Sequence, residues 1–284
     1  LECLTPERTD ITLLVKNKAT NERFIAKCYT DKKHLSHVTE ADILKNLNHP
    51  GLLRFADRFE NDRMLCVVRE YVRGTPLDRY AAKNTLSERQ AVAFAVELCD
   101  ILAYLHGQNP PVIHRDIKPQ NLIVDETGGL HLIDFGISRT YSKDSEEDTV
   151  CFGTKDFAPP EQYGFAQTDA RADIFSLGVL IGWMLTHNSE RKNICKNIKN
   201  RYLRRVVKKS TAFAPDERYR SVEKVKRALL NADGHRQKTA VRLACVVLAC
   251  AACLCAGFAI GRYTDAALPF STDNVRFREP LIEQ

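Results

Sequence analysis

The run Ile113–Asn121, IHRDIKPQN, combines side chains that could do chemistry together. Asp116 and Lys118 stand two positions apart, and Asn121 follows three positions later. A second carboxylate, Asp134, opens the tripeptide DFG further along the chain. Carboxylate and amide oxygens are hard ligands that suit Mg²⁺, and an ammonium group neutralises negative charge. A lone aspartate or asparagine in a loop is more often a turn former, so a functional interpretation needs the whole set together.

The order of these motifs resembles that of the protein kinase family. HRDIKPQN, DFG and GTKDFAPPE follow one another at the family's separations, and the three together are far more specific than any one of them. The resemblance implies that Asp116 receives or orients the proton of the substrate hydroxyl and that Lys118 lies near the migrating phosphoryl group. It also implies that Asn121 and Asp134 bind Mg²⁺, which bridges the phosphates of ATP.

The resemblance implies that residues of the N-terminal part bind the nucleotide. By the same resemblance, Lys27 in the run FIAK grips the α- and β-phosphates, and Glu40 holds Lys27 in place. Ala26 is expected to line the adenine pocket. Glu70 and Val72, in the run EYV, resemble the hinge between the lobes, whose backbone groups bond adenine.

Other matches to the family are structural or regulatory. The resemblance implies that Asp173 anchors the backbone around His114 and Arg115, and that Arg218 pairs with the glutamate of the PPE motif, Glu161. An arginine next to the catalytic aspartate resembles kinases that are switched on by phosphorylation of the activation loop. A phosphate on Thr149 is expected to pair with Arg115 and to order that loop, and the alternative that Thr149 is an ordinary loop hydroxyl stays open.

Hydrophobic patterning indicates a small β-rich part followed by a larger helical part. The expected strands span Ile11–Val15, Phe24–Tyr29 and Met64–Val68, and the expected helices span Ser36–Leu47, Ala91–Leu105, Ala170–Leu185 and Ser221–Leu230. Ser87 and Gln90 form a capping box before the second of these helices. The resemblance implies an α+β, two-lobed protein-kinase-like fold, with the kinase N-lobe at residues 1–72 and the kinase C-lobe at residues 73–232.

One apolar stretch predicts a single transmembrane helix. Residues 243–261 carry no charge, and at about 1.5 Å per residue they reach about 28 Å, close to the ~30 Å core of a bilayer. A buried core helix is the alternative. More cations precede this stretch, in the basic juxtamembrane segment 233–242, than follow it. The positive-inside rule therefore predicts a single-pass protein of the cell membrane with a cytoplasmic kinase domain.

Residues 262–284 are then an extracytoplasmic tail. The end of the tail, from Asn274 onwards, resembles the opening of leucine-rich-repeat ectodomains of bacterial surface proteins, which predicts the start of a truncated ectodomain. The alternative is a short tail without a fold. A homodimer, formed through the membrane helix or an ectodomain, is a further expectation.

Composition and short motifs narrow the class of protein. A hydrophobic fraction of 44% and a charged fraction of 27% exclude a mainly disordered chain, and a net charge of +6 is too small to argue for nucleic acid as a partner. The expected partners are protein substrates, which stay unknown.

Reduced thiols are expected for the cysteines from Cys3 to Cys195. Lys118 resembles the serine/threonine kinases, and HRDIKPQN with PPEQYG resembles bacterial membrane-anchored members.

Two departures from the family pattern favour a second hypothesis. The glycine-rich loop is missing, because its three glycines would fall near Thr5, Glu7 and Asp10. Arg69 precedes the hinge, where family members usually carry an apolar or small residue, and a buried arginine needs a partner. The alternative to an active kinase is therefore a pseudokinase, a nucleotide-binding signalling scaffold with little or no transfer activity.

Overall fold

The computed structural model describes residues 2–6, 10–29, 40–61, 64–135, 139–140, 156–163, 168–188 and 190–232. The chain divides into two units, Leu1–Asp233 and Gly234–Gln284. The predicted juxtamembrane segment, transmembrane helix and tail lie outside the described residues. Within the ranges given above, no helix has the length and hydrophobicity needed to cross a membrane.

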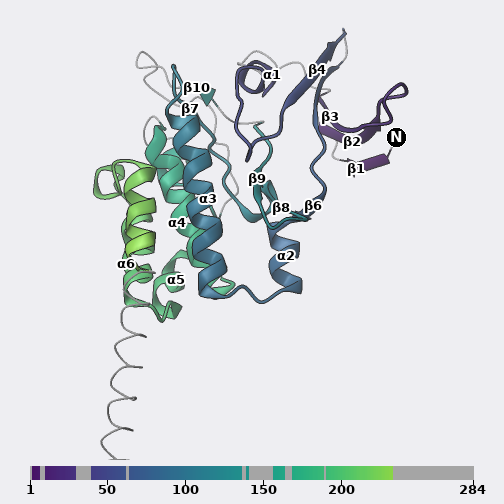
Figure 1. The fold of residues 1–284 in the computed structure, drawn as a ribbon. Helices are drawn as coiled ribbons and strands as arrows, with labels where there is room; N and C mark the ends of the chain where they lie inside the picture. Colours follow the sequence, from purple (N-terminus) through teal and green to yellow (C-terminus); the bar gives the residue numbers. More distant parts are fainter. Residues whose placement is uncertain are drawn as a thin grey trace, which may run out of the picture. The chain divides into compact units, whose positions relative to one another are not determined.

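A five-stranded antiparallel sheet forms the N-terminal part (Figure 1). Its strands lie in the order β1-β2-β3-β5-β4, and one short helix, α1 (Glu40–Leu44), follows β3 in the chain. The strands span β1 Glu2–Pro6, β2 Asp10–Lys16, β3 Arg23–Tyr29, β4 Phe55–Glu60 and β5 Leu65–Glu70. All three strands expected from the sequence are present. The expected helix Ser36–Leu47 is described only from Glu40, because 30–39 lie outside the described residues.

Alternation along β3 and β5 divides their side chains between two faces of the sheet. Lys27 pairs with Val67 and Ile25 with Arg69 on one face, and Ala26 pairs with Val68 on the other. Ala26 therefore lies on the face opposite to Lys27. This placement argues against Ala26 as an adenine contact beside Lys27, because neighbouring residues of a strand point in opposite directions.

Two cysteines form a disulfide on the same face as Ala26. Cys28 of β3 lies directly opposite Cys66 of β5, and the two residues are bonded, with a Cα–Cα distance of 4.1 Å. The expectation of reduced thiols is wrong for this pair. Spacing in the sequence could not show it, because the register of two antiparallel strands brings residues 38 positions apart into direct contact.

Reduction of the disulfide is expected to lower the free energy of unfolding. A bond that closes a loop of this length restricts the unfolded chain, and the typical contribution is about 2–4 kcal/mol. Urea denaturation with and without a reductant measures the difference. The Cys66→Ser variant should be insensitive to the reductant, whereas the free Cys195 can be replaced by serine without loss of sensitivity. Superimposable curves for the oxidised and reduced protein would contradict this prediction.

Helices build the C-terminal part. They span α2 Leu77–Lys83, α3 Glu88–His106, α4 Ala170–Thr186, α5 Arg191–Asn197 and α6 Arg201–Ser210, and residues 222–232 are also helical. The predicted capping box is confirmed, since the Ser87 hydroxyl accepts from the Gln90 N–H and the Gln90 side chain accepts from the Ser87 N–H. Two small sheets complete this part, with strand orders β6-β8-β9 and β10-β7. Their strands span β6 Gly74–Pro76, β7 Val112–Ile113, β8 Leu122–Asp125, β9 Leu130–Leu132 and β10 Arg139–Thr140.

Helix α4 is the centre of the core. Most of its residues are buried, and it lies alongside α3 and α6 (Figure 1). Two glycines allow this close packing. A Cβ atom on Gly178 would lie 2.5 Å from the Cβ of Ser210, and one on Gly182 would lie 2.2 Å from a methyl group of Ile194. The central helix thus provides a rigid support for the loop that carries the HRD motif.

Candidate active site

Asp173, in the first turn of α4, holds the loop that carries the HRD motif. This carboxylate accepts hydrogen bonds from the backbone N–H groups of His114 (2.9 Å) and Arg115 (2.8 Å), and Nε2 of His106 lies 2.8 Å from it. Burial alone would raise the pKa of Asp173, but the hydrogen bond with His106 holds the pKa below its ordinary value. The predicted anchoring role of Asp173 is confirmed. The role of His106 was not expected from the sequence.

Three predicted site residues meet at the end of this loop. The Nζ atom of Lys118 lies 2.8 Å from Oδ2 of Asp116, and Nδ2 of Asn121 donates to the same oxygen at 2.7 Å. Asn121 also donates to the backbone carbonyl of Asp116 at 2.9 Å, from the short 3₁₀ turn Pro119–Asn121. Both of these bonds use Nδ2, which leaves the amide oxygen of Asn121 as the atom suited to a metal ion.

Two further residues of the predicted site, Lys27 and Asp134, form an ion pair. The Nζ atom of Lys27 lies 2.6 Å from Oδ1 of Asp134, and the Lys27 side chain is only 9% exposed. Burial alone would lower the pKa of Lys27, but the charges of Asp134 and Glu40 raise it above its ordinary value. The partly buried Asp134 carboxylate therefore binds one cation, the Lys27 ammonium.

A backbone hydrogen bond joins the two groups of residues. The N–H of Ile133, next to Asp134, donates to the carbonyl of Asn121 at 2.9 Å. Asn121 and Asp134, the two predicted metal ligands, thus stand on adjoining segments. The described residues include no cluster of three or more His, Cys, Asp or Glu side chains able to hold a metal ion. One carboxylate and one amide oxygen are too few to surround Mg²⁺ with protein ligands alone. They suit a site in which Mg²⁺ is also bound by phosphate oxygens.

Glu40 does not pair with Lys27, contrary to the prediction. Its Oε1 lies 2.5 Å from Nη1 of Arg69, and its Oε2 accepts a hydrogen bond from the hydroxyl of Tyr29. The partner that the sequence could not name for Arg69 is therefore Glu40. The physical reason is the position of these side chains: Arg69 and Tyr29 lie on the same face of the sheet as Lys27, and both contact Glu40 at the start of α1.

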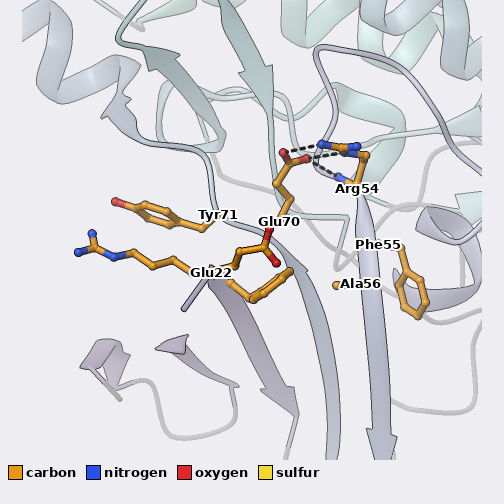
Figure 2. A pocket seen from close by; sticks show the side chains of 8 residues that line it. Glu22, Arg54, Phe55, Ala56, Glu70 and Tyr71 are labelled. Carbon is orange, nitrogen blue, oxygen red and sulfur yellow. Dashed lines mark hydrogen bonds and ion pairs between the residues drawn. The ribbon is translucent and has the colours of Figure 1, made fainter. Parts of the chain in front are cut away.

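The predicted hinge lies at the end of β5. The Glu70 N–H donates to the carbonyl of Arg54 at 2.9 Å, and the Glu70 carboxylate faces the Arg54 guanidinium (Figure 2). A hollow of about 460 Å³ beside it is lined by residues that include Phe24 and Tyr71. Phe24 pairs with Glu70 on the face opposite to Lys27, so this hollow is not the place where Lys27 and Asp134 meet. Val72, which follows Tyr71 in the chain, is half-buried.

The predicted regulatory pair is described only in part. Arg115 is buried, with a positive φ of 70°, and its carbonyl accepts from Nε2 of Gln162 at 2.8 Å. Thr149 lies outside the described residues, so the pairing of a phosphate on Thr149 with Arg115 stays a prediction. The predicted pair Arg218–Glu161 is confirmed, with distances of 2.5 and 2.8 Å.

Stability is expected to fall as the pH drops below about 6.5, partly because of His114. Burial lowers the pKa of His114 below its ordinary value of 6.5. The unfolded chain then binds a proton that the folded chain does not, so this contribution is present above the unfolded pKa and is lost as the pH falls. The slope is at most about 1.4 kcal/mol per pH unit for one proton.

Urea denaturation of the wild type and of His114→Phe measures this dependence. The measurements are made at about pH 7.5, 6.5 and 5.5, which bracket the ordinary pKa of a histidine. The variant should lose less stability than the wild type over this interval, whatever its stability at the highest pH. Equal slopes would show that His114 does not contribute.

Comparison with known proteins identifies the family. The protein kinase domain family matches residues 11–247 of the 284 residues. The chain therefore belongs to the protein kinase family.

Similar curated proteins are eukaryotic kinases. The chain is 36% identical over 190 residues to CBL-interacting protein kinase 25 of Oryza sativa subsp. japonica, which covers 61% of this chain and 36% of that protein. It is 38% identical over 143 residues to serine/threonine-protein kinase Aurora-2 of Arabidopsis thaliana, which covers 50% of this chain and 49% of that protein. It is 34% identical over 160 residues to serine/threonine-protein kinase 36 of Pongo abelii. This match covers 56% of this chain and 12% of that protein. The matches thus span less than half the length of each of these relatives.

Proposed function

We propose that the protein is an ATP-dependent serine/threonine protein kinase that transfers the γ-phosphoryl group of ATP to hydroxyl groups of other proteins. Family membership supports this proposal, as do the serine/threonine kinases among the relatives. The single observation that carries it is the arrangement of Asp116, Lys118 and Asn121 next to the Lys27–Asp134 pair.

Each residue of the arrangement has a chemical role in the proposal. Asp116 accepts or orients the proton of the substrate hydroxyl, and Lys118, which is 2.8 Å from it, neutralises charge beside the transferred group. Lys27 leaves Asp134 to bind phosphate oxygens, which frees the Asp134 carboxylate for the metal. Mg²⁺, held by Asp134 and Asn121 when bound, would neutralise the charge of the phosphates. The protein's contribution is mainly position and electrostatics.

Membrane anchoring is part of the proposal and depends on the sequence. The uncharged residues 243–261, preceded by three cations in the juxtamembrane segment, favour a single-pass membrane protein with the kinase domain in the cytoplasm. Signalling to protein substrates, homodimer formation and an ectodomain after the membrane helix remain proposals on the same basis. The relatives reported above are eukaryotic, so they lend no support to a bacterial origin.

A pseudokinase scaffold is the second candidate, and one feature favours it. The sequence between β1 and β2, where the family has its glycine-rich loop, contains Glu7 and no glycine, and Asp10 is the first residue of β2. Two acidic residues near the phosphates weaken binding of a nucleotide unless other cations compensate. A scaffold would bind nucleotide weakly or not at all and would transfer no phosphate.

Incubation of the full chain with Mg²⁺, radiolabelled ATP and a generic basic protein separates the two candidates. The kinase proposal expects label on the protein substrate, and phosphoamino-acid analysis should find it on serine and threonine. Binding of ATP without any transfer would favour the scaffold. Label found mainly on tyrosine would contradict the proposed specificity.

A further inference from the structure

Five polar side chains gather under the N-terminal sheet, around the start of α1. Lys27 and Tyr29 come from β3, Arg69 comes from β5, Glu40 opens α1, and Asp134 comes from the DFG motif. They form two pairs, Lys27–Asp134 at 2.6 Å and Arg69–Glu40 at 2.5 Å. The phenol of Tyr29 links the pairs, because its hydroxyl donates to Glu40 and its ring centre lies 5.2 Å from the Lys27 ammonium.

The charges of this cluster are balanced and mostly buried. Two cations face two carboxylates, and the Arg69 and Glu40 side chains are only 5% and 1% exposed. Burial together with the negative charge of Glu40 raises the pKa of Tyr29, so the phenol stays neutral and its hydroxyl donates a hydrogen bond to the Glu40 carboxylate. The position of Arg69 decides which cation Glu40 uses. Without Arg69, the buried Glu40 would lack its guanidinium partner, and the Lys27 ammonium lies close enough for the charge of Glu40 to raise its pKa.

We propose that Arg69 is a positioning residue that neutralises Glu40 in place of Lys27, so that the charge of Lys27 stays available for the phosphates of a nucleotide. The proposal rests on the proposed function and adds a residue to the nucleotide site. In this arrangement Asp134 is the one carboxylate from which Lys27 would have to separate, and Asp134 would then be available to hold Mg²⁺. The Arg69 side chain stays buried in its ion pair with Glu40, and its Nε atom has no hydrogen-bond acceptor among the described residues.

Isothermal titration of the full chain with Mg-ATP tests the proposal. The Arg69→Met variant removes the cation and leaves the cluster with one excess negative charge, so its affinity for Mg-ATP should fall about tenfold. Arg69→Lys keeps the charge and should retain most of the affinity. Adding Glu40→Gln to Arg69→Met restores the balance and should recover most of the loss. Adenosine, which lacks phosphates, should bind all of these variants equally.

A matched control and a second variant keep the test decisive. Arg58→Met removes an exposed arginine of β4 that pairs with Asp42 and Glu60, and it should bind Mg-ATP as the wild type does. If Arg69→Met does not fold, Glu40→Gln alone serves: binding at least as tight as the wild type supports the proposal, and weaker binding overturns it. Unchanged affinity in a folded Arg69→Met, or no recovery in the double variant, also overturns it. Failure of the wild type to bind Mg-ATP would instead refute the proposed function.

Discussion

Replacement of Asp116 by asparagine is expected to reduce kcat for phosphoryl transfer by about 10²–10⁴-fold. The Oδ2 atom of Asp116 is the point where Lys118 and Asn121 converge, at 2.8 and 2.7 Å. An amide in this position cannot accept the proton of a hydroxyl. It also removes the negative charge that holds the Lys118 ammonium in place.

Initial rates at saturating Mg-ATP measure the effect on kcat, and a titration with Mg-ATP measures nucleotide affinity separately. Affinity should change little, because Lys27 and Asp134 are untouched. Asp57→Asn is the matched control, because it makes the same change at an exposed position of β4. A rate for Asp116→Asn equal to that of the wild type would remove Asp116 from the proposed chemistry.

Replacement of Arg218 by leucine should lower the free energy of unfolding by about 3–5 kcal/mol. The Arg218 side chain is completely buried and forms a two-point ion pair with Glu161. It also donates to the carbonyls of Ala212, Arg171 and Phe213, and its guanidinium lies 4.8 Å from the centre of the Phe175 ring. Leucine leaves the buried Glu161 carboxylate and three carbonyl oxygens without their donors, which is the costly part of the change.

Urea denaturation followed by circular dichroism measures this loss. The control is Arg220→Leu, two residues along the chain, where the arginine is exposed and the expected change is within about 0.5 kcal/mol. A double variant, Arg218→Leu with Glu161→Leu, should be more stable than Arg218→Leu alone, because it no longer buries an unpaired charge. Equal stability of the Arg218 and Arg220 variants would contradict the structural role of the pair.

The residues of the catalytic loop could be predicted because they are close together in the sequence. Asp116, Lys118 and Asn121 fall within six positions, so any loop that the central helix supports brings them near one another. The capping box at Ser87 was predictable for the same reason, since it depends on residues three positions apart. The family resemblance added the long-range pair Arg218–Glu161, which no local pattern indicates.

The contacts that sequence reasoning missed all depend on how distant segments pack. The pairing of Glu40 with Arg69 requires the position of α1 relative to β5, and the Cys28–Cys66 bond requires the register of β3 and β5. Ala26 was misplaced for a simpler reason: strand parity puts it on the face opposite to Lys27, and Ile25 shares the Lys27 face. The unusual residue Arg69 was itself a visible signal, since a charged residue in a strand that is otherwise apolar on that face needs a buried partner.

The most direct test of the account is a titration of the full chain with ATP in the presence and absence of Mg²⁺, for the wild type and for Asp134→Asn. The proposed function requires Lys27, Asn121 and Asp134 to share one triphosphate. It predicts that Mg²⁺ strengthens ATP binding to the wild type at least tenfold and has little effect on the Asp134→Asn variant. Binding of ATP that is the same with and without Mg²⁺, or a metal effect that survives the loss of the Asp134 carboxylate, would contradict it.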